Sequence, residues 1–281
     1  MKDSAIDLSD GRVLAYTDIG ESGRLCVLLF HGAPSSRLRV AYLENEFVAS
    51  GVRVISPDRP WYGRSSPQPG RSMADWPSDV SALTEALGIE RFAVAGHSSG
   101  GPYAVACAAL LSDRVSGLVT LGCVTDMDWP GAWEGYIESE RELMRMPDEE
   151  SVVAWCIEHF GEDGSRFMAA SGMDLPAADL PLYEDERIAS MLATARAEAF
   201  RQGVGGYAQD VFIQGRPWPF DPEQIRAPTM ILQGEGDTLL PMTHAQHTAD
   251  LVPGARLRML PQHGHFSILG ELPAVAAGFA L

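Results

Sequence analysis

The sequence predicts an α/β protein with a mostly parallel sheet, flanking helices and an inserted helical segment. Short continuous apolar runs alternate with amphipathic segments, a pattern typical of strands that are covered by helices on both faces. The alternation stops between about residues 128 and 214, where the pattern is helical without strand runs, and resumes afterwards. We therefore expect a core in two parts, residues 1–127 and 215–281, and a helical cap at 128–214.

The order of elements follows from the runs themselves. A hairpin is expected first, because an Asp10-Gly11 turn separates two alternating segments. The predicted strands are residues 4–8, 12–19, 25–30, 52–56, 92–95, 115–121, 229–233 and 256–260, and the predicted core helices lie near 38–49, 73–87 and 98–111. Within the cap, strong helix formers predict a helix at 191–202, and the residues expected to be linkers are 203–206 and 216–222.

Charge narrows the range of partners. The 281 residues include 21 Lys and Arg but 38 Asp and Glu, for a net charge of −17. Such a surface repels phosphate backbones and anionic headgroups, so we expect neither nucleic acid nor membrane as a partner. A small-molecule substrate, neutral or cationic, is easier to accommodate, and the oligomeric state stays open.

The first residues and the cysteines lead us to expect a cytoplasmic protein. The first residues have no apolar core flanked by basic residues, so no signal peptide is expected. The longest apolar runs are too short to span a bilayer. The four cysteines are scattered without a Cys-x-x-Cys pair, and three lie in apolar runs, which favours reduced side chains packed in the core.

A glycine-rich segment from Gly96 to Gly101 has the pattern of a strand, a sharp turn and a helix, with Ser98 at the turn. Glycines on either side suit a strained turn in which the returning helix passes close to the strand. This strain would lift the Ser98 hydroxyl clear of the sheet, beside backbone N–H groups at the helix start. The motif therefore predicts a nucleophilic serine rather than a simple helix cap.

These features resemble the α/β-hydrolase superfamily, in particular its capped esterase-like members. The resemblance covers nearly the whole chain apart from the cap. His31-Gly32-Ala33-Pro34 is similar to the family's oxyanion loop, and the Asp58–Ser65 segment is similar to its D-x-x-G-x-G-x-S loop. Trp61 stands where the family usually has glycine, which leaves the local backbone path open and suggests an aromatic group near the pocket.

The family order of nucleophile, acid and histidine identifies the remaining candidates. Asp237, after the run at 229–233, matches the acid position, with Glu235 and Asp126 as rivals. His265, in a Gly-His-Phe sequence after the last predicted strand, matches the base, while His263 is expected to be a solvated loop residue or a pocket wall.

The resemblance implies acyl-transfer chemistry for these residues. His265 would take the proton of Ser98 during attack, because a neutral hydroxyl is a weak nucleophile. Asp237 would orient and stabilise the imidazole. The backbone N–H groups of Ala33 and Ser99 would bind the oxyanion, a contribution of roughly 3 kcal/mol per donor in comparable enzymes.

The cap is rich in Trp and Met, which favours an apolar pocket between cap and core. The candidate pocket residues are His31, Trp61, His97, Trp129 and Trp133. His31 is expected to act mainly through structural hydrogen bonds.

No cofactor or metal is indicated. The glycines at 203–206 follow a helix rather than a strand, and so do not form a phosphate loop. His244 and His247 lack the H-E-x-x-H spacing of a metal site and are expected to be solvent-exposed.

The leading functional prediction is a serine hydrolase that cleaves a carboxylic ester or lactone of a small, largely apolar substrate through an acyl-enzyme. A lyase, cyclase or acyltransferase with the same three residues is the alternative, because fold does not determine function. An aminopeptidase and a ligand-binding receptor are further alternatives.

Overall fold

An eight-stranded sheet forms the centre of the molecule in the computed structural model, which describes residues 1–21, 23 and 25–280. The strand order is β1-β2-β4-β3-β5-β6-β7-β8, with antiparallel pairing for β1–β2 and β2–β4 and parallel pairing elsewhere. The strands are β1 (Lys2–Asp7), β2 (Val13–Ile19), β3 (Leu25–Phe30), β4 (Val52–Pro57), β5 (Phe92–His97), β6 (Val115–Leu121), β7 (Thr229–Gly234) and β8 (Arg256–Leu260). The predicted hairpin and mostly parallel sheet are confirmed.

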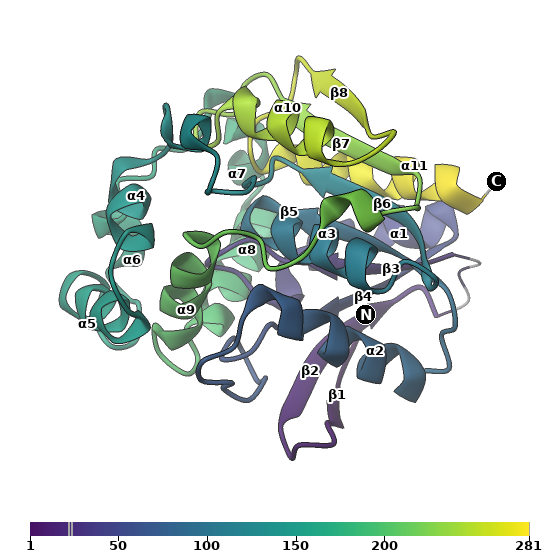
Figure 1. Ribbon diagram of the computed structural model, residues 1–281, viewed down its shortest axis with the longest axis horizontal. Helices are drawn as coiled ribbons and strands as arrows, with labels where there is room; N and C mark the ends of the chain where they lie inside the picture. Colours follow the sequence, from purple (N-terminus) through teal and green to yellow (C-terminus); the bar gives the residue numbers. More distant parts are fainter. Residues whose placement is uncertain (22, 24, 281) are drawn as a thin grey trace.

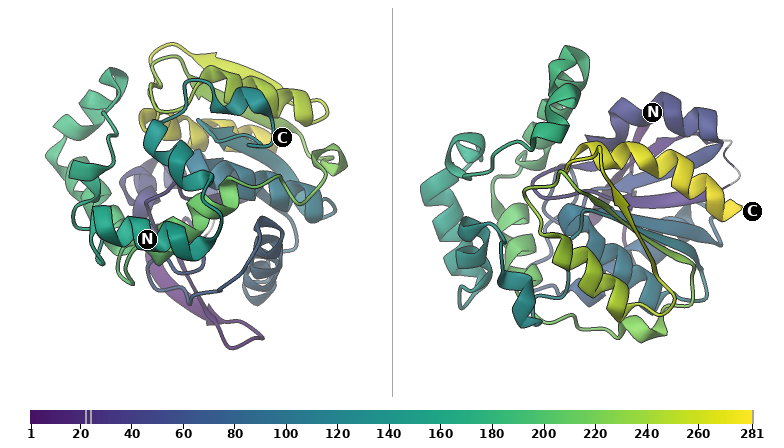
Figure 2. Two further views of the ribbon diagram at one scale, coloured as in Figure 1. Left: turned by 60° about the vertical axis from the view of Figure 1, so that its left-hand side comes forward. Right: turned by 90° about the horizontal axis from the view of Figure 1, so that it is seen from above.

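Helices cover both faces of this sheet (Figures 1 and 2). On one face lie α2 (Trp76–Ala86), α3 (Gly101–Leu110) and α10 (Met242–Leu251), and on the other lie α1 (Glu44–Ser50) and α11 (Leu272–Ala277). The packing of strand β3 on both faces explains why all of its residues are apolar. Leu28 and Phe30 pack into the core cluster on the α2–α3 side, whereas Val27 and Leu29 pack into the opposite cluster.

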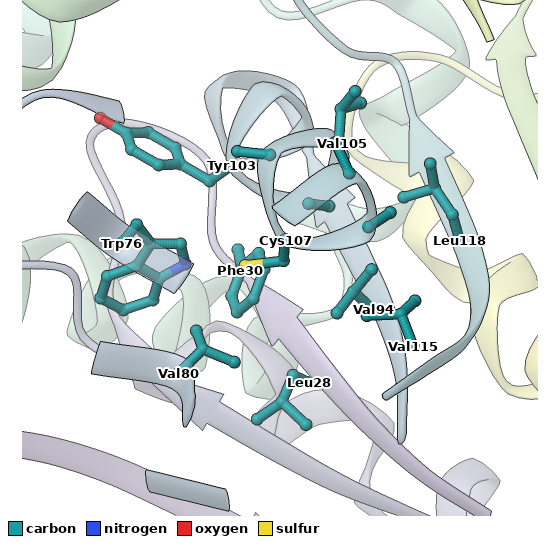
Figure 3. Close-up of a cluster of buried hydrophobic side chains, with 14 of the residues drawn as sticks. Leu28, Phe30, Trp76, Val80, Val94, Tyr103, Val105, Cys107, Val115 and Leu118 are labelled. Atoms are coloured by element: carbon teal, nitrogen blue, oxygen red, sulfur yellow. The ribbon is translucent and has the colours of Figure 1, made fainter. Parts of the chain in front are cut away.

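The core on the α2–α3 side holds the strands that position the site (Figure 3). Phe30 of β3 meets the Trp76 ring edge-on at 5.4 Å, and Trp76 meets Tyr103 of α3 in the same way at 6.4 Å. The burial of each large apolar side chain of this kind adds roughly 1.5–3 kcal/mol to the free energy of unfolding. Phe92 and Val94 of β5 belong to the same buried cluster as Tyr103, so the strand and the helix on both sides of the Ser98 turn share one core.

A helical insert occupies the chain between β6 and β7, at the left of Figure 1. Its helices are α4 (Glu138–Met144), α5 (Glu149–Phe160), α6 (Phe167–Ala170), α7 (Leu180–Glu184), α8 (Glu186–Ala199) and α9 (Gly205–Gln214). An aromatic cluster of Phe160, Phe167, Phe200 and Tyr207 forms much of its own core. The expected boundaries at residues 128 and 214 stay a prediction.

A buried ionic cluster joins the last insert helix to the sheet core. Asp210 of α9 accepts hydrogen bonds from Arg59 at 2.7 Å, from Arg71 and from the Tyr103 hydroxyl at 2.7 Å. All four side chains are buried. We call Asp210, Arg59, Arg71 and Tyr103 the Asp210 cluster.

The structure corrects two details of the predicted elements. Residues 203–206 are not simply a linker, because Gly205 and Gly206 begin α9. Residues Arg37–Leu43 form the 3-10 turn η1 ahead of α1, where one continuous helix was expected.

The four cysteines are free, with Cys107, Cys123 and Cys156 buried and Cys26 half-buried. Within the described residues, none of the helices is both long and apolar enough to cross a membrane.

Candidate active site

Ser98 lies at the sharp turn between β5 and α3, with a left-handed backbone (φ +55°) that serine rarely adopts. The flanking glycines are required by close packing. A Cβ atom on Gly96 would collide with the backbone of Gly100, and one on Gly100 would collide with the carbonyl oxygen of Phe30. The sequence places glycine where the turn has no room for a side chain.

Ser98, His265 and Asp237 form one hydrogen-bonded chain. His265 Nδ1 lies 2.8 Å from Asp237 Oδ2, and His265 Nε2 lies 2.9 Å from Ser98 Oγ. Because a carboxylate can only accept, Nδ1 carries the proton and Nε2 accepts the Ser98 hydroxyl. This is the geometry needed for His265 to take the proton of Ser98.

The surroundings of Asp237 keep its carboxylate charged. Oδ1 accepts from the backbone N–H groups of Leu239 at 2.9 Å and Leu240 at 3.0 Å. Burial alone raises the pKa of Asp237, but the His265 interaction and these two N–H donors outweigh it, so the net pKa lies below its ordinary value. Asp237 is therefore ionised at neutral pH.

The rival residues lie elsewhere. Glu235 is exposed, and the carboxylate of Asp126 accepts from the nearby Asp128 backbone N–H at 3.0 Å. His263 Nε2 lies 3.4 Å from Glu271 Oε1, in the same loop as His265 but bonded to a different partner. Of the candidate acids and bases, the structure brings Asp237 and His265 to Ser98.

Two further histidines support the site from behind. His97 donates from Nε2 to the carbonyl oxygen of His265 at 2.7 Å, which fixes the loop that carries the candidate base. His31 donates from Nδ1 to the Gly32 carbonyl oxygen at 2.8 Å and accepts from the Arg59 backbone N–H at 3.3 Å. Burial lowers the pKa of both rings well below the ordinary value, so both are neutral.

The loop expected to bind an oxyanion lies against the serine. A Cβ atom on Gly32 would stand 3.0 Å from the Ser98 Cβ, and the next residue, Ala33, lines the same cavity as Ser98. Ser99 is buried in the first turn after the strand. The roles of the Ala33 and Ser99 backbone N–H groups remain a prediction.

A cavity of about 200 Å³ opens above Ser98, between the core loops and the insert. Ser98, His97 and His265 form part of its wall. Most of the remaining wall is apolar, formed by Gly32, Ala33, Pro34, Ile137, Phe167, Met168, Met173, Leu175, Leu192, Leu239, Leu240 and Phe266. Such a lining suits a small, largely apolar ligand.

Four of the five expected pocket residues do not line this cavity: among the described residues that form its wall, His97 is present, but His31, Trp61, Trp129 and Trp133 are absent. Trp61 has a left-handed backbone (φ +72°), which explains the family's usual glycine there. Its ring packs where Gly205 of α9 has no side chain, away from the space above Ser98.

The Trp129 and Trp133 predictions fail for a similar reason, because each ring has another partner. Trp129 stacks on His247 with ring centroids 4.3 Å apart, and Trp133 packs under the guanidinium of Arg145, 4.3 Å from its ring centroid. These contacts of the two rings thus stabilise the first part of the insert.

The expectation that His244 and His247 are exposed is wrong. His244 is fully buried, donates from Nε2 to the Ala132 carbonyl oxygen at 2.8 Å and accepts from the Thr125 backbone N–H at 3.3 Å. His247 is half-buried against Trp129. Both residues join α10 to the start of the insert.

Sequence reasoning did not single out the charged residues of the cavity wall, among them Arg39, Glu140 and Arg196. Glu140 accepts hydrogen bonds from the hydroxyls of Tyr136 and Tyr207. Burial raises the pKa of Glu140 above its usual range despite these two donors. No local motif marks any of the three, because the insert meets the core only after folding.

No metal site is formed by the described part of the chain, in the sense that three or more His, Cys, Asp or Glu side chains nowhere gather in a suitable arrangement.

The sheet order, the helical insert and a strained serine hydrogen-bonded to a histidine and an acid are features of α/β-hydrolases. The alpha/beta hydrolase fold family model matches residues 26–272, and the chain belongs to this family. It is a hydrolase of the α/β-hydrolase fold.

Three individual proteins to which the chain is similar are distant from it in sequence. The chain is 28% identical to an uncharacterized hydrolase, YcgS, of Bacillus subtilis, over 97% of this chain and 95% of the relative. It is 25% identical to a bifunctional esterase/perhydrolase of Acinetobacter calcoaceticus, over 92% of each chain. A solved structure of a thermophilic esterase from Thermogutta terrifontis superposes with a TM-score of 0.68 at 23% identity, covering 99% of this chain and 96% of that one, which shows the shared fold.

Proposed function

We propose that the protein is a serine hydrolase that cleaves a carboxylic ester or lactone of a small, largely apolar substrate. The observation that carries the proposal is the hydrogen-bonded chain from Asp237 through His265 to Ser98, which opens into an apolar cavity of about 200 Å³. A hydroxyl, a neutral imidazole and an ionised acid in this order are the groups that nucleophilic acyl transfer needs.

The first half of the proposed reaction forms an acyl-enzyme. Ser98 Oγ attacks the ester carbonyl carbon while its proton passes to His265 Nε2. The imidazolium is stabilised by Asp237, whose lowered pKa keeps it charged. His265 then returns the proton to the leaving alkoxide, which departs as an alcohol.

The second half releases the product acid. Water replaces the alcohol, gives a proton to His265 Nε2 and attacks the acyl carbon, and the proton then passes to Ser98 Oγ as the ester bond to the enzyme breaks. In both halves the carbonyl oxygen carries negative charge. We assign the stabilisation of this charge to the backbone N–H groups of Ala33 and Ser99. The position of Gly32 against Ser98 supports this assignment.

The relatives support an ester substrate without naming it. One of them carries esterase and perhydrolase in its printed name. The apolar part of the cavity wall supports an acyl or alkyl group beside Ser98.

The test is turnover of p-nitrophenyl esters with acyl chains of two to eight carbons. We expect hydrolysis by the wild-type protein and labelling of Ser98 by a fluorophosphonate, with both lost in Ser98→Ala. Hydrolysis that persists in Ser98→Ala would remove Ser98 as the nucleophile. Labelling of Ser98 without turnover of any ester would instead favour a lyase, cyclase or acyltransferase.

A further inference from the structure

Arg39 is a buried cation in the wall of the Ser98 cavity. It lies on the turn η1, only 7% exposed, and its Nη2 atom is buried without a hydrogen-bond partner. The guanidinium lies over the Phe266 ring, 5.2 Å from its centroid, and Phe266 in turn contacts His265. One aromatic ring thus separates this cation from the candidate base.

The neighbouring arginines show how unusual this is for the chain. Arg37, on the same turn, is ion-paired with Asp3, Asp58 and Glu198. Arg59, also buried, is ion-paired with Asp210. Across the described residues, no carboxylate lies within ion-pair distance of the Arg39 guanidinium, although acidic residues outnumber basic ones 38 to 21 in the whole chain.

A buried guanidinium without a counterion destabilises a fold unless something supplies the missing negative charge. Its aromatic neighbours Phe266 and Tyr42, whose ring centroid lies 5.9 Å away, provide only a weak cation–π attraction. A bound anion in the cavity that Arg39 lines would supply the missing negative charge to its guanidinium.

A second arginine lines the same cavity. Arg196 of α8 is half-buried, and among the described residues its side chain has neither an ion pair nor a hydrogen bond. Helix α8 is fixed to η1 by the Ser36 hydroxyl, which donates to the Ala195 carbonyl oxygen at 2.8 Å, and by the Arg37–Glu198 ion pair at 2.7 Å. The two guanidiniums therefore belong to adjoining, mutually anchored elements.

We propose that Arg39, assisted by Arg196, binds a carboxylate of the substrate while Ser98 attacks an ester or lactone carbonyl elsewhere in the same molecule. A guanidinium offers paired N–H donors that match the two oxygens of a carboxylate. The substrate class is then a monoester or lactone that keeps one free carboxylate. This inference rests on the proposed ester hydrolysis.

The acidic residues that face the cavity are compatible with an anionic ligand. Glu140 is hydrogen-bonded to Tyr136 and Tyr207, and burial raises its pKa, which favours its neutral form. Asp174 is exposed to solvent, where water screens its charge. His97 is neutral because burial lowers its pKa.

The experiment compares matched esters that differ in one charge. The p-nitrophenyl hemiesters of succinic, glutaric and adipic acid are set against p-nitrophenyl esters of neutral acyl chains of similar length. We expect the wild-type kcat/KM to favour at least one hemiester over its neutral partner. In Arg39→Met this preference should fall about 10- to 100-fold, the range expected for a lost charged hydrogen bond.

Arg187→Met is the matched control, because Arg187 lies on the same helix as Arg196 but is exposed and outside the cavity wall. It removes the same charge and should leave the preference unchanged. Arg39→Lys keeps the positive charge without the paired N–H donors of the guanidinium, and it should retain part of the preference. If Arg39→Met does not fold, Arg39→Lys and Arg196→Met replace it, each with a reduced preference expected.

A binding measurement separates this inference from the proposed function. Glutarate should raise the melting temperature of Ser98→Ala, and this rise should be lost when Arg39→Met is added. Arg39→Met alone should be at least as stable as wild type, because it removes an uncompensated buried charge. A purely structural Arg39 would instead lower stability and change both esters equally.

The outcomes are distinct. Ester turnover without a hemiester preference in the wild type, or with the same preference in Arg39→Met, would overturn the carboxylate site and leave the proposed function intact. If no ester is turned over, the proposed function fails, and glutarate binding alone decides the site. If no ester is turned over and glutarate also does not bind, the proposed carboxylate site is overturned.

Discussion

Replacing Asp210 by Asn tests whether the Asp210 cluster anchors the insert. Asp210 accepts from Arg59 at 2.7 and 2.9 Å, from Arg71 and from Tyr103 at 2.7 Å, and every member is buried. Removing one partner of a buried ion pair costs about 3–5 kcal/mol, since it leaves an uncompensated charge. Both arginines keep a neutral acceptor, the His31 carbonyl oxygen and Gln209 Oε1 respectively. We therefore expect a loss of about 4 kcal/mol, rather than twice the cost of one pair.

The assay is urea unfolding at pH 7, followed by circular dichroism. With a slope of about 3 kcal/mol per molar urea, the expected loss lowers the midpoint by more than 1 M. Asp113→Asn is the control, because Asp113 pairs with Arg226 at 3.4 Å while 91% of its side chain is exposed. An exposed pair contributes about 1 kcal/mol or less. Equal losses in the two variants would refute the anchoring role of Asp210.

Three further predictions follow from the site and its surroundings. Acidification from pH 7 to pH 4 should lower the free energy of unfolding by about 3 kcal/mol through His244. Burial lowers the pKa of His244 to about 4 in the folded protein, whereas the same side chain in the unfolded chain takes up a proton below about pH 6.5. His244→Gln should remove that part of the loss in urea titrations at the two pH values. Asp237→Asn should lower kcat on p-nitrophenyl esters by about 10⁴-fold, because the imidazole loses the acceptor that sets its tautomer. Gly100→Ala should lower the free energy of unfolding by about 3 kcal/mol, because its methyl group collides with backbone atoms of β3 and the loop after it, which cannot rotate away.

Each of these has a matched control. His159→Gln changes an exposed histidine and should leave the pH dependence of stability unaltered. Glu235→Gln changes an exposed neighbour of Asp237 and should keep kcat within about twofold, on the order of surface effects. Gly270→Ala adds a methyl group where nothing lies within 4 Å and should not destabilise the protein. A control that behaves like its test variant would contradict the corresponding explanation.

The strands and the three candidate catalytic residues could be predicted because their signals are local. The runs at 25–30 and 115–121 match β3 and β6 residue for residue, since a strand covered on both faces has a mostly apolar sequence. Ser98, Asp237 and His265 each follow a strand at the same edge of the sheet, so their order along the chain predicts that they meet.

The cavity could not be predicted in the same way, because it depends on how the insert docks. Arg39 and Glu140 are far apart in the chain and share a wall only in the folded state. His244 is buried because the carbonyl oxygen of Ala132 lies against it, a partner more than a hundred residues away. Trp61 lies outside the cavity wall because a left-handed backbone, which the sequence does not reveal, turns its ring toward Gly205.

The location of the helical insert has an evolutionary consequence. The chain between β6 and β7 supplies much of the cavity wall, while Ser98, Asp237 and His265 all come from loops of the sheet core. The part of the cavity wall that the insert supplies is thus encoded in a different stretch of the gene from Ser98, Asp237 and His265, whereas Arg39 belongs to the core stretch. A recombination event could exchange one stretch as a cassette and leave the other untouched, provided that the incoming segment brings an acid to meet Arg59 and Arg71. Diversification of substrates in such a lineage does not require the chemistry to be invented again.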